Sequence, residues 1–170
     1  IFYLFFSTFI FLTPKQSPSA ELSLGISAIE LGDSLYRSSL NLHLGVYNIH
    51  LRGHYHQRSF GPVDEKMIIF NIHNMFKTPF YKNLSAGYGI SLLHQETKIS
   101  YIEEEDKIFD KNDKNQNIGF LLGLYWSWFS KNPYYLRVGI EANLYPAGAN
   151  ILLLVAARQQ VIFLETGLFL

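Results

Sequence analysis

The chain has 170 residues, no cysteine, and 14 lysine and arginine residues that balance 14 aspartate and glutamate residues. The length suits one domain with a sizeable core, and the balanced charge gives no argument for a nucleic-acid partner. The absence of cysteine excludes disulfides, thiolate metal sites and cysteine catalysis.

Residues 1–20 begin with a twelve-residue apolar run, IFYLFFSTFIFL, and end in the small residues Ser19 and Ala20. The run is too short to cross a bilayer of ~30 Å as a helix. Its order, apolar and then small, resembles a secretory signal peptide, although the usual basic start is missing, as in a sequence truncated at its beginning. We expect residues 1–20 to be a signal peptide and 21–170 to form one domain. A buried N-terminal strand or helix is the alternative.

From Glu21 onward, apolar residues recur at every second position, which places them on one face of a strand. The alternation runs through 22–28, 40–46, 68–76, 84–92, 118–128 and 134–144. No segment after Ala20 shows convincing helical periodicity. The sequence therefore predicts an all-β fold.

The opposite face of these strands consists mainly of glycine, serine and asparagine. A soluble sandwich or lipocalin would place many lysines and glutamates on its outer face. Small residues instead suit the inside of a narrow barrel. With 48% hydrophobic and 16% aromatic residues, the pattern favours a barrel whose apolar face meets lipid.

Short turn-type stretches separate the strands at 32–34, 61–65, 130–133 and 146–150. The long segment 103–117, EEEDKIFDKNDKNQN, is predicted to be a solvated charged loop or hairpin tip. A calcium loop is disfavoured because lysines interleave its carboxylates and no glycine turn is present.

The number of strands depends on two ambiguous places. The alternation slips at 46–49, which is either a turn at Tyr47-Asn48 or a bulge; a second turn is conceivable at 158–160. Both turns together give nine strands, and either one alone gives eight, the even number that bacterial barrels favour. We prefer the first turn, which makes strands of 36–46 and 49–60 and one overlong last strand, 151–170.

Residues 21–170 resemble the small eight-stranded outer-membrane β-barrels of the OmpA and OmpX type. Their aromatic girdle is matched by Trp126, Trp128, Tyr134 and Tyr135. The chain end, VIFLETGLFL, is similar to the terminal strand that barrel-assembly machinery recognises. The resemblance implies an eight-stranded antiparallel up-and-down transmembrane β-barrel, exported to the outer membrane of a Gram-negative-type cell. It implies outer-membrane lipid, lipopolysaccharide and the assembly machinery as partners, a monomer, and no cofactor.

The stretch HLRGHYH, residues 50–56, raises the question of a metal site. On a strand, every second residue from 50 to 58 shares one face: His50, Arg52, His54, His56 and Arg58. A zinc or copper site is disfavoured, because two arginines lie beside it and no nearby carboxylate completes the shell. We therefore expect no metal, and interpret these residues as an interior polar strip.

Buried charges persist only when they are paired. Arg137 and Glu141 share a strand face, and Glu165 lies in the last strand. We predict that these three join an arginine of 49–60 in an interior network of ion pairs and hydrogen bonds. In eight strands such a network fills the interior and leaves no pore.

The sequence thus favours a non-catalytic structural or surface-interaction protein. One alternative is a lipid A acyl transferase or deacylase on the same scaffold, with Ser91, His54 and Glu141 as serine, base and carboxylate. However, the chain has neither the His-x-Ser-Asn stretch of the deacylases nor a clear amphipathic N-terminal helix like that of the acyl transferases. A second alternative is a soluble, lipocalin-like periplasmic binding barrel.

Overall fold

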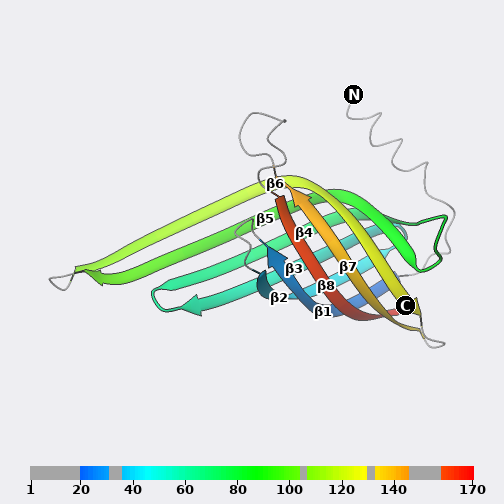
Figure 1. Ribbon diagram of the computed structural model, residues 1–170, viewed down its shortest axis with the longest axis horizontal. Helices are drawn as coiled ribbons and strands as arrows, with labels where there is room; N and C mark the ends of the chain where they lie inside the picture. Colours follow the sequence, from blue (N-terminus) through cyan, green and yellow to red (C-terminus); the bar gives the residue numbers. More distant parts are fainter. Residues whose placement is uncertain (1–19, 31–35, 104–106, 130–132, 146–157) are drawn as a thin grey trace, which may run out of the picture.

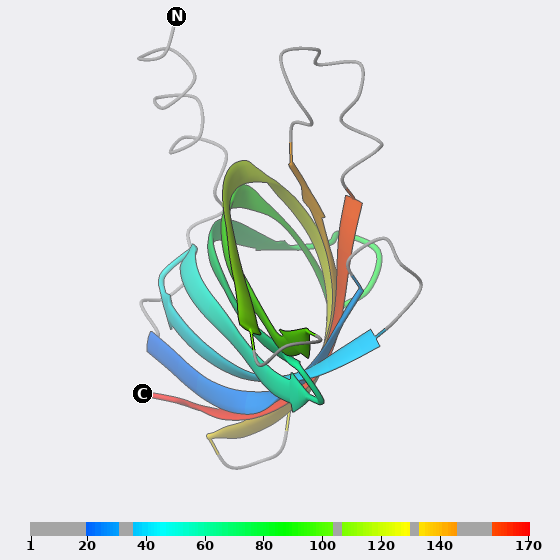
Figure 2. The same cartoon turned by 90° about the vertical axis from the view of Figure 1, so that its left-hand side faces the viewer.

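The computed structural model describes residues 20–30, 36–103, 107–129, 133–145 and 158–170 (Figure 1). These described residues form eight strands: β1 (Ala20–Glu30), β2 (Tyr36–Val46), β3 (Ile49–Phe60), β4 (Val63–Lys77), β5 (Leu84–Glu103), β6 (Lys107–Phe129), β7 (Tyr134–Leu144) and β8 (Arg158–Phe169). Each strand pairs antiparallel with the next, and β8 pairs with β1, which closes the sheet into a barrel (Figure 2). The predicted all-β up-and-down barrel is confirmed. Among the described residues, no helix is long and apolar enough to cross a membrane.

The preferred turn at Tyr47-Asn48 is also confirmed. Val46 lies opposite Ile49, so only two residues connect β2 and β3. Tyr47 has a φ of 57°, in the left-handed region that tight turns require. The alternation slips at this point because the chain reverses there, and β2 and β3 have the predicted bounds.

The described part of the last strand, β8, begins at Arg158, which pairs with Leu144 of β7. The predicted start of this strand at 151 lies outside the described residues. The alternative turn at 158–160 does not occur, since these residues belong to β8. Residues 146–157 lie outside the described part of the chain, and so does the predicted signal peptide except Ala20, where β1 begins.

Of the two alternatives predicted for 103–117, a loop or a hairpin tip, the structure shows the hairpin. Lys107 pairs with Glu103, and Asn117 pairs with Leu93, so this segment belongs to an extended β5–β6 hairpin. Backbone hydrogen bonds sustain such a ladder without alternating apolar residues, which is why the sequence pattern did not reveal it. β5 and β6 have 20 and 23 residues, against 11 in β1, β2 and β7. The β5–β6 hairpin accordingly projects far beyond the shorter strands (Figure 1).

The two ends of the barrel differ. Connections 47–48 and 78–83 lie at the end where β1 begins and β8 ends, which we call the turn end; β6 ends and β7 begins there too. The two chain segments meet there, because the Leu170 amide donates to the Ala20 carbonyl at 2.7 Å. The β5–β6 hairpin reverses at the opposite end, the hairpin end.

The two faces of the sheet are inverted relative to a soluble protein. Large apolar side chains point outward and are exposed, as at Leu24 (60%), Leu40 (59%) and Leu122 (54%). Arginine, glutamate and histidine side chains point inward, and Arg52 and Glu141 have no exposed surface. The predicted apolar outer face is therefore the one that the structure shows. The interior is polar in part only, because it also holds a cluster of buried apolar side chains: Ile29, Met67, Ile69, Leu93, Tyr145 and Val161.

Candidate functional site

The interior side chains form rows that run across neighbouring strands. Residues paired across an antiparallel ladder point to the same side of the sheet. The row nearest the turn end is Glu21, Gly45, His50 and His73. The next row is Ser23, His43, Arg52, Asn71 and Ser91.

Five charged side chains form the centre of the interior, and we call them the charge network: Glu21, Arg52, Arg137, Glu141 and Glu165. Arg52 donates to Glu141 and, at 3.0 Å, to Glu165. Arg137 donates to Glu165 at 3.0 Å and to Glu21 at 2.8 Å. All five are buried. Their mutual pairing offsets the cost of removing the charges from water.

Aromatic rings cover the two guanidinium groups of the charge network. The Arg52 guanidinium lies 4.0 Å from the ring centre of Phe163, and the Arg137 guanidinium lies 4.6 Å from that of Tyr135. Such contacts stabilise a buried cation electrostatically. They also fill the space beside the ion pairs.

Most residues of the predicted network lie inside the barrel. His50, Arg52, His54, His56, Arg137, Glu141 and Glu165 are all buried. Arg58 is the exception, because it is exposed and covers the ring of Phe60 at 5.2 Å. The ladder between β2 and β3 extends only as far as Tyr55 opposite Leu40, so Arg58 lies three residues beyond the part of β3 that pairs with β2.

Sequence reasoning missed Glu21 as a member of the charge network. The residue shares the phase of Ser23, Gly25 and Ser27 on β1, and this phase was the available signal. Glu21 was not assigned to the interior because it lies directly after the expected signal peptide. The expectation that no carboxylate lies near the β3 histidines is therefore wrong.

The proposed catalytic trio is assembled only in part. His54 Nε2 lies 3.2 Å from Glu141 Oε2, but its Nδ1 lies 3.0 Å from Ser27 Oγ. Ser91 Oγ is instead bonded to the Tyr145 hydroxyl at 2.7 Å. Ser91 belongs to a different row of interior side chains from His54. Alternation shows only which side chains face inward, so it did not identify Ser27 as the serine that contacts His54.

Three histidines from β2, β3 and β4 are stacked close to the turn end. His43 Nε2 lies 3.0 Å from His50 Nδ1, and His50 Nδ1 lies 2.9 Å from Glu21 Oε1. The ring of His73 stacks on that of His50 with centres 5.4 Å apart. The sequence did not predict this group because it combines histidines from three strands.

The aromatic girdle is also only partly as predicted. Trp128 and Tyr134 point outward and are exposed, and Trp126 is half-buried. Tyr135 is buried beneath Arg137, because the two residues share one phase of β7 and so one face of the sheet. Tyr135 therefore belongs to the interior.

No family model matches the chain, and no curated protein matches it. Solved structures do match, among them the following two. The N-terminal β-barrel domain of Pseudomonas aeruginosa OprF shares 12% identity, covering 91% of this chain and 100% of that one, with a TM-score of 0.56. Ail, the attachment invasion locus protein of Yersinia pestis, in complex with the heparin analogue sucrose octasulfate, shares 13% identity with the same coverage and a TM-score of 0.55. The chain thus has the fold of the small eight-stranded outer-membrane β-barrels.

Proposed function

We propose that the chain is an integral outer-membrane β-barrel protein with a structural or surface-interaction role. The observation that carries this proposal is the inversion of the two faces. An exposed band of leucine, isoleucine and phenylalanine surrounds a charged interior. Lipid accommodates such a band, whereas water does not. A lipocalin-like carrier needs the opposite arrangement, an interior open to an apolar ligand and a charged outer face.

The interior acts as a plug in this proposal. The charge network spans the barrel, and Arg52, Tyr125 and Phe163 fill its centre without exposed surface. Eight strands enclose a space only wide enough for side chains. The proposed protein therefore conducts no solutes and carries out no reaction.

The surface role is assigned to the β5–β6 hairpin. A tilted strand crosses the membrane in ~9–11 residues, so about half of β5 and β6 extends beyond it. The described side chains at 111–116 are polar and exposed. Lys98 and Lys114 lie 3.8 and 3.4 Å from Glu96, so charges of both signs are presented together. A rigid two-stranded extension of this kind suits contact with a protein or glycan surface.

The expected export and orientation follow from this proposal. Residues 1–20 direct the chain out of the cytoplasm, and the assembly machinery inserts it into the outer membrane. The turn end then faces the periplasm, and the hairpin end faces the outside. The barrel is a monomer in contact with outer-membrane lipid and lipopolysaccharide.

Cell fractionation combined with gel electrophoresis tests this proposal. The chain is expressed in a Gram-negative host, and the outer-membrane and osmotic-shock fractions are compared. An inserted barrel remains in the membrane fraction and migrates differently in detergent gels before and after boiling. Release by osmotic shock, without a shift on boiling, would support the periplasmic carrier instead.

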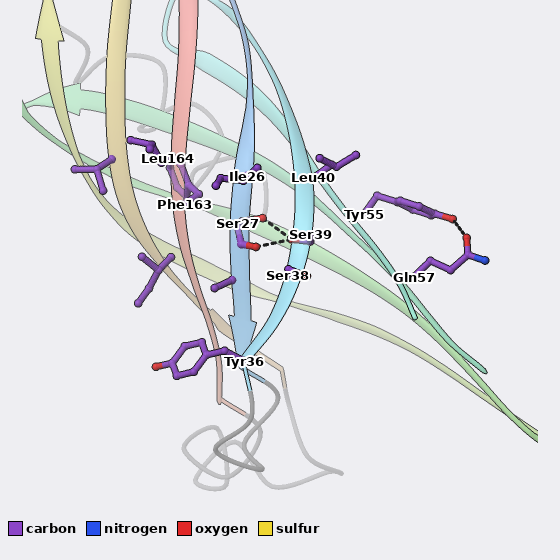
Figure 3. Close-up of a pocket in the computed structure, with 13 residues that line it drawn as sticks. Ile26, Ser27, Tyr36, Ser38, Ser39, Leu40, Tyr55, Gln57, Phe163 and Leu164 are labelled. Atoms are coloured by element: carbon purple, nitrogen blue, oxygen red, sulfur yellow. Dashed lines mark hydrogen bonds between the residues drawn. The ribbon is translucent and has the colours of Figure 1, made fainter. Parts of the chain in front are cut away.

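A second candidate function is modification of lipid A by acyl transfer or deacylation. It is favoured by two contacts of one histidine: His54 Nδ1 lies 3.0 Å from Ser27 Oγ, and His54 Nε2 lies 3.2 Å from Glu141 Oε2. Ser27 also lines a groove of about 730 Å³ whose other walls include Ile26, Leu40 and Leu164 (Figure 3). An apolar groove beside a serine suits an acyl chain.

The hydrogen bonds of Ser27 and of Glu141 make this second function the weaker one. Ser27 is already hydrogen-bonded to Ser39, as Figure 3 shows. Glu141 also accepts hydrogen bonds from Arg52, Asn71 and Tyr125, which hold its charge in place. Mass spectrometry of lipid A decides between the functions. If the barrel is an enzyme, its overexpression changes lipid A, and Ser27→Ala abolishes that change. If it is not an enzyme, overexpression leaves lipid A as it was.

A further inference from the structure

We propose that the barrel interior holds a divalent transition-metal ion near its turn end, ligated by Glu21, His43 and His50. The proposal is independent of the surface role. The three side chains come from β1, β2 and β3, and all three are buried. Their ligand atoms lie within 4.8 Å of one another. Two imidazoles and a carboxylate form a ligand set that suits zinc or copper.

The distances between the ligand atoms fit a common metal ion. His50 Nδ1 lies 2.9 Å from Glu21 Oε1 and 3.0 Å from His43 Nε2, and the third pair is 3.8 Å apart. Nitrogen and oxygen ligands at ~2.0–2.2 Å in a tetrahedral site lie about 3.4 Å from each other. Each observed separation differs from this value by only about half an ångström.

Hydrogen bonding alone satisfies this group poorly. A neutral imidazole nitrogen has either one N–H or one lone pair. His50 Nδ1 nevertheless approaches both a carboxylate oxygen and a second imidazole nitrogen. One proton must serve both contacts if no ion is bound. A cation would instead accept the lone pairs of all three ligand atoms.

The charge of the interior also favours a cation. Among the described residues, the buried charged side chains other than histidine are three carboxylates and two guanidinium groups. Glu21, Glu141 and Glu165 against Arg52 and Arg137 leave one negative charge. An uncompensated buried charge is costly. A metal ion beside Glu21 would compensate it.

The surroundings orient the ligands and leave space for the ion. His43 Nδ1 lies 3.1 Å from Ser23 Oγ and 3.6 Å from Glu165 Oε1, which are outer partners of the kind that fix metal-bound imidazoles. Arg137 takes the other oxygen of Glu21. Between Glu21 and His50 lies Gly45, where a Cβ would come within 2.6 Å of His50 Nδ1 and 2.8 Å of Glu21 Oε1. The glycine therefore keeps the site open.

His73 provides a second indication of a ligand. It is only 2% exposed, and neither ring nitrogen has a hydrogen-bond partner among the described residues. Buried polar groups are normally paired. Its ring stacks on those of His43 and His50, with centres 6.3 and 5.4 Å away. His73 is therefore a buried imidazole with unpaired nitrogens that lies directly against two of the proposed ligands.

Metal titration of the untagged chain, folded in detergent micelles, tests the proposal. Cobalt(II) is added as a probe for zinc, and the visible absorption of a four-coordinate site is followed. The wild type is expected to bind one equivalent. Glu21→Gln and His50→Gln should each weaken binding at least about tenfold. His56→Gln is the matched control, because His56 is also a buried β3 histidine but lies toward the hairpin end.

The proposal is overturned if the folded wild type binds no stoichiometric metal, or if His56→Gln weakens binding as much as His50→Gln. Should the site variants fail to fold, electron paramagnetic resonance of copper(II) bound to the wild type decides. Two or three nitrogen ligands support the site. Coordination by oxygen alone contradicts it.

Discussion

Arg52 Nη2 on β3 lies 3.0 Å from Glu165 Oε1 on β8, although 113 residues separate the two in the chain. β1 and β2 lie between these strands in the sheet, so the contact crosses the interior rather than following a ladder. It forms only when the barrel is closed. The charge network therefore links walls of the barrel that backbone hydrogen bonds do not join directly.

Removal of Arg52 should destabilise the barrel strongly. Arg52→Met leaves Glu141 and Glu165 without their shared guanidinium inside the barrel. Breaking a buried ion pair on one side costs about 3–5 kcal/mol. Urea unfolding in detergent, followed by tryptophan fluorescence, measures the change. The control Arg58→Met should unfold like the wild type, because Arg58 is exposed. Equal stability of the two variants would contradict the account of the network.

An added methyl group should disturb the barrel at one interior glycine and have no effect at an outward-facing one. A Cβ at Gly139 would lie 2.3 Å from Phe163 Cζ inside the barrel, whereas a Cβ at Gly53 meets nothing within 4 Å. Overpacking an interior costs about 1–3 kcal/mol. Gly139→Ala should therefore reduce the fraction of heat-modifiable barrel, and Gly53→Ala should not. A loss in both variants would mean that Gly53 does not face outward.

The strands could be predicted because each carries a local signal. Apolar residues alternate wherever one face meets the outside, and the slip at Tyr47-Asn48 marks a real turn. The β5–β6 extension lacks that signal, since both of its faces are polar at 111–116. Its pairing rests on backbone hydrogen bonds, to which almost any polar sequence can contribute. Local pattern therefore identifies the strand segments with an apolar outer face and does not give the pairing within the projection.

A charge on the outer face should be costly only where the strand crosses lipid. Leu122 lies on the outer face of β6, opposite Tyr88 and Ala142. Arginine at the midplane of a barrel costs about 2–4 kcal/mol. Leu122→Arg should lower the stability of the barrel in liposomes by that amount. The matched change Asn112→Arg, on the exposed hairpin of the same strand, should leave it unaltered. Similar losses in both variants would argue against a membrane boundary between them.

Shortening of the β5–β6 hairpin should separate folding from surface function. Ile99 is the last residue of β5 that pairs with β4, so the described residues of this range, 101–103 and 107–109, pair only with each other. Replacement of 101–109 by an Asn-Gly turn should leave heat-modifiability intact. Binding of whole cells to protein-coated or glycan-coated surfaces should fall. A barrel that fails to fold would show that the hairpin has a structural role instead.

The contents of the interior could be predicted, but not their partners. Phase alone places Arg52, Glu141 and Glu165 on the inner face. Which of them meet depends on the stagger between strands distant in sequence, which a single chain's alternation does not encode. For the same reason Ser27, rather than Ser91, meets His54. Tyr135 is different, because its shared phase with Arg137 was visible in the sequence.

The central claim is that the apolar outer face meets lipid, and spin labelling tests it most directly. The chain has no cysteine, so Leu24→Cys, Leu122→Cys and Lys98→Cys each introduce one labelling site. In liposomes, the labels at 24 and 122 should be accessible to oxygen and shielded from a water-soluble nickel complex. The label at Lys98, on the hairpin, should show the reverse. Exposure of the labels at 24 and 122 to the nickel complex, in a folded barrel, would contradict the membrane-spanning account.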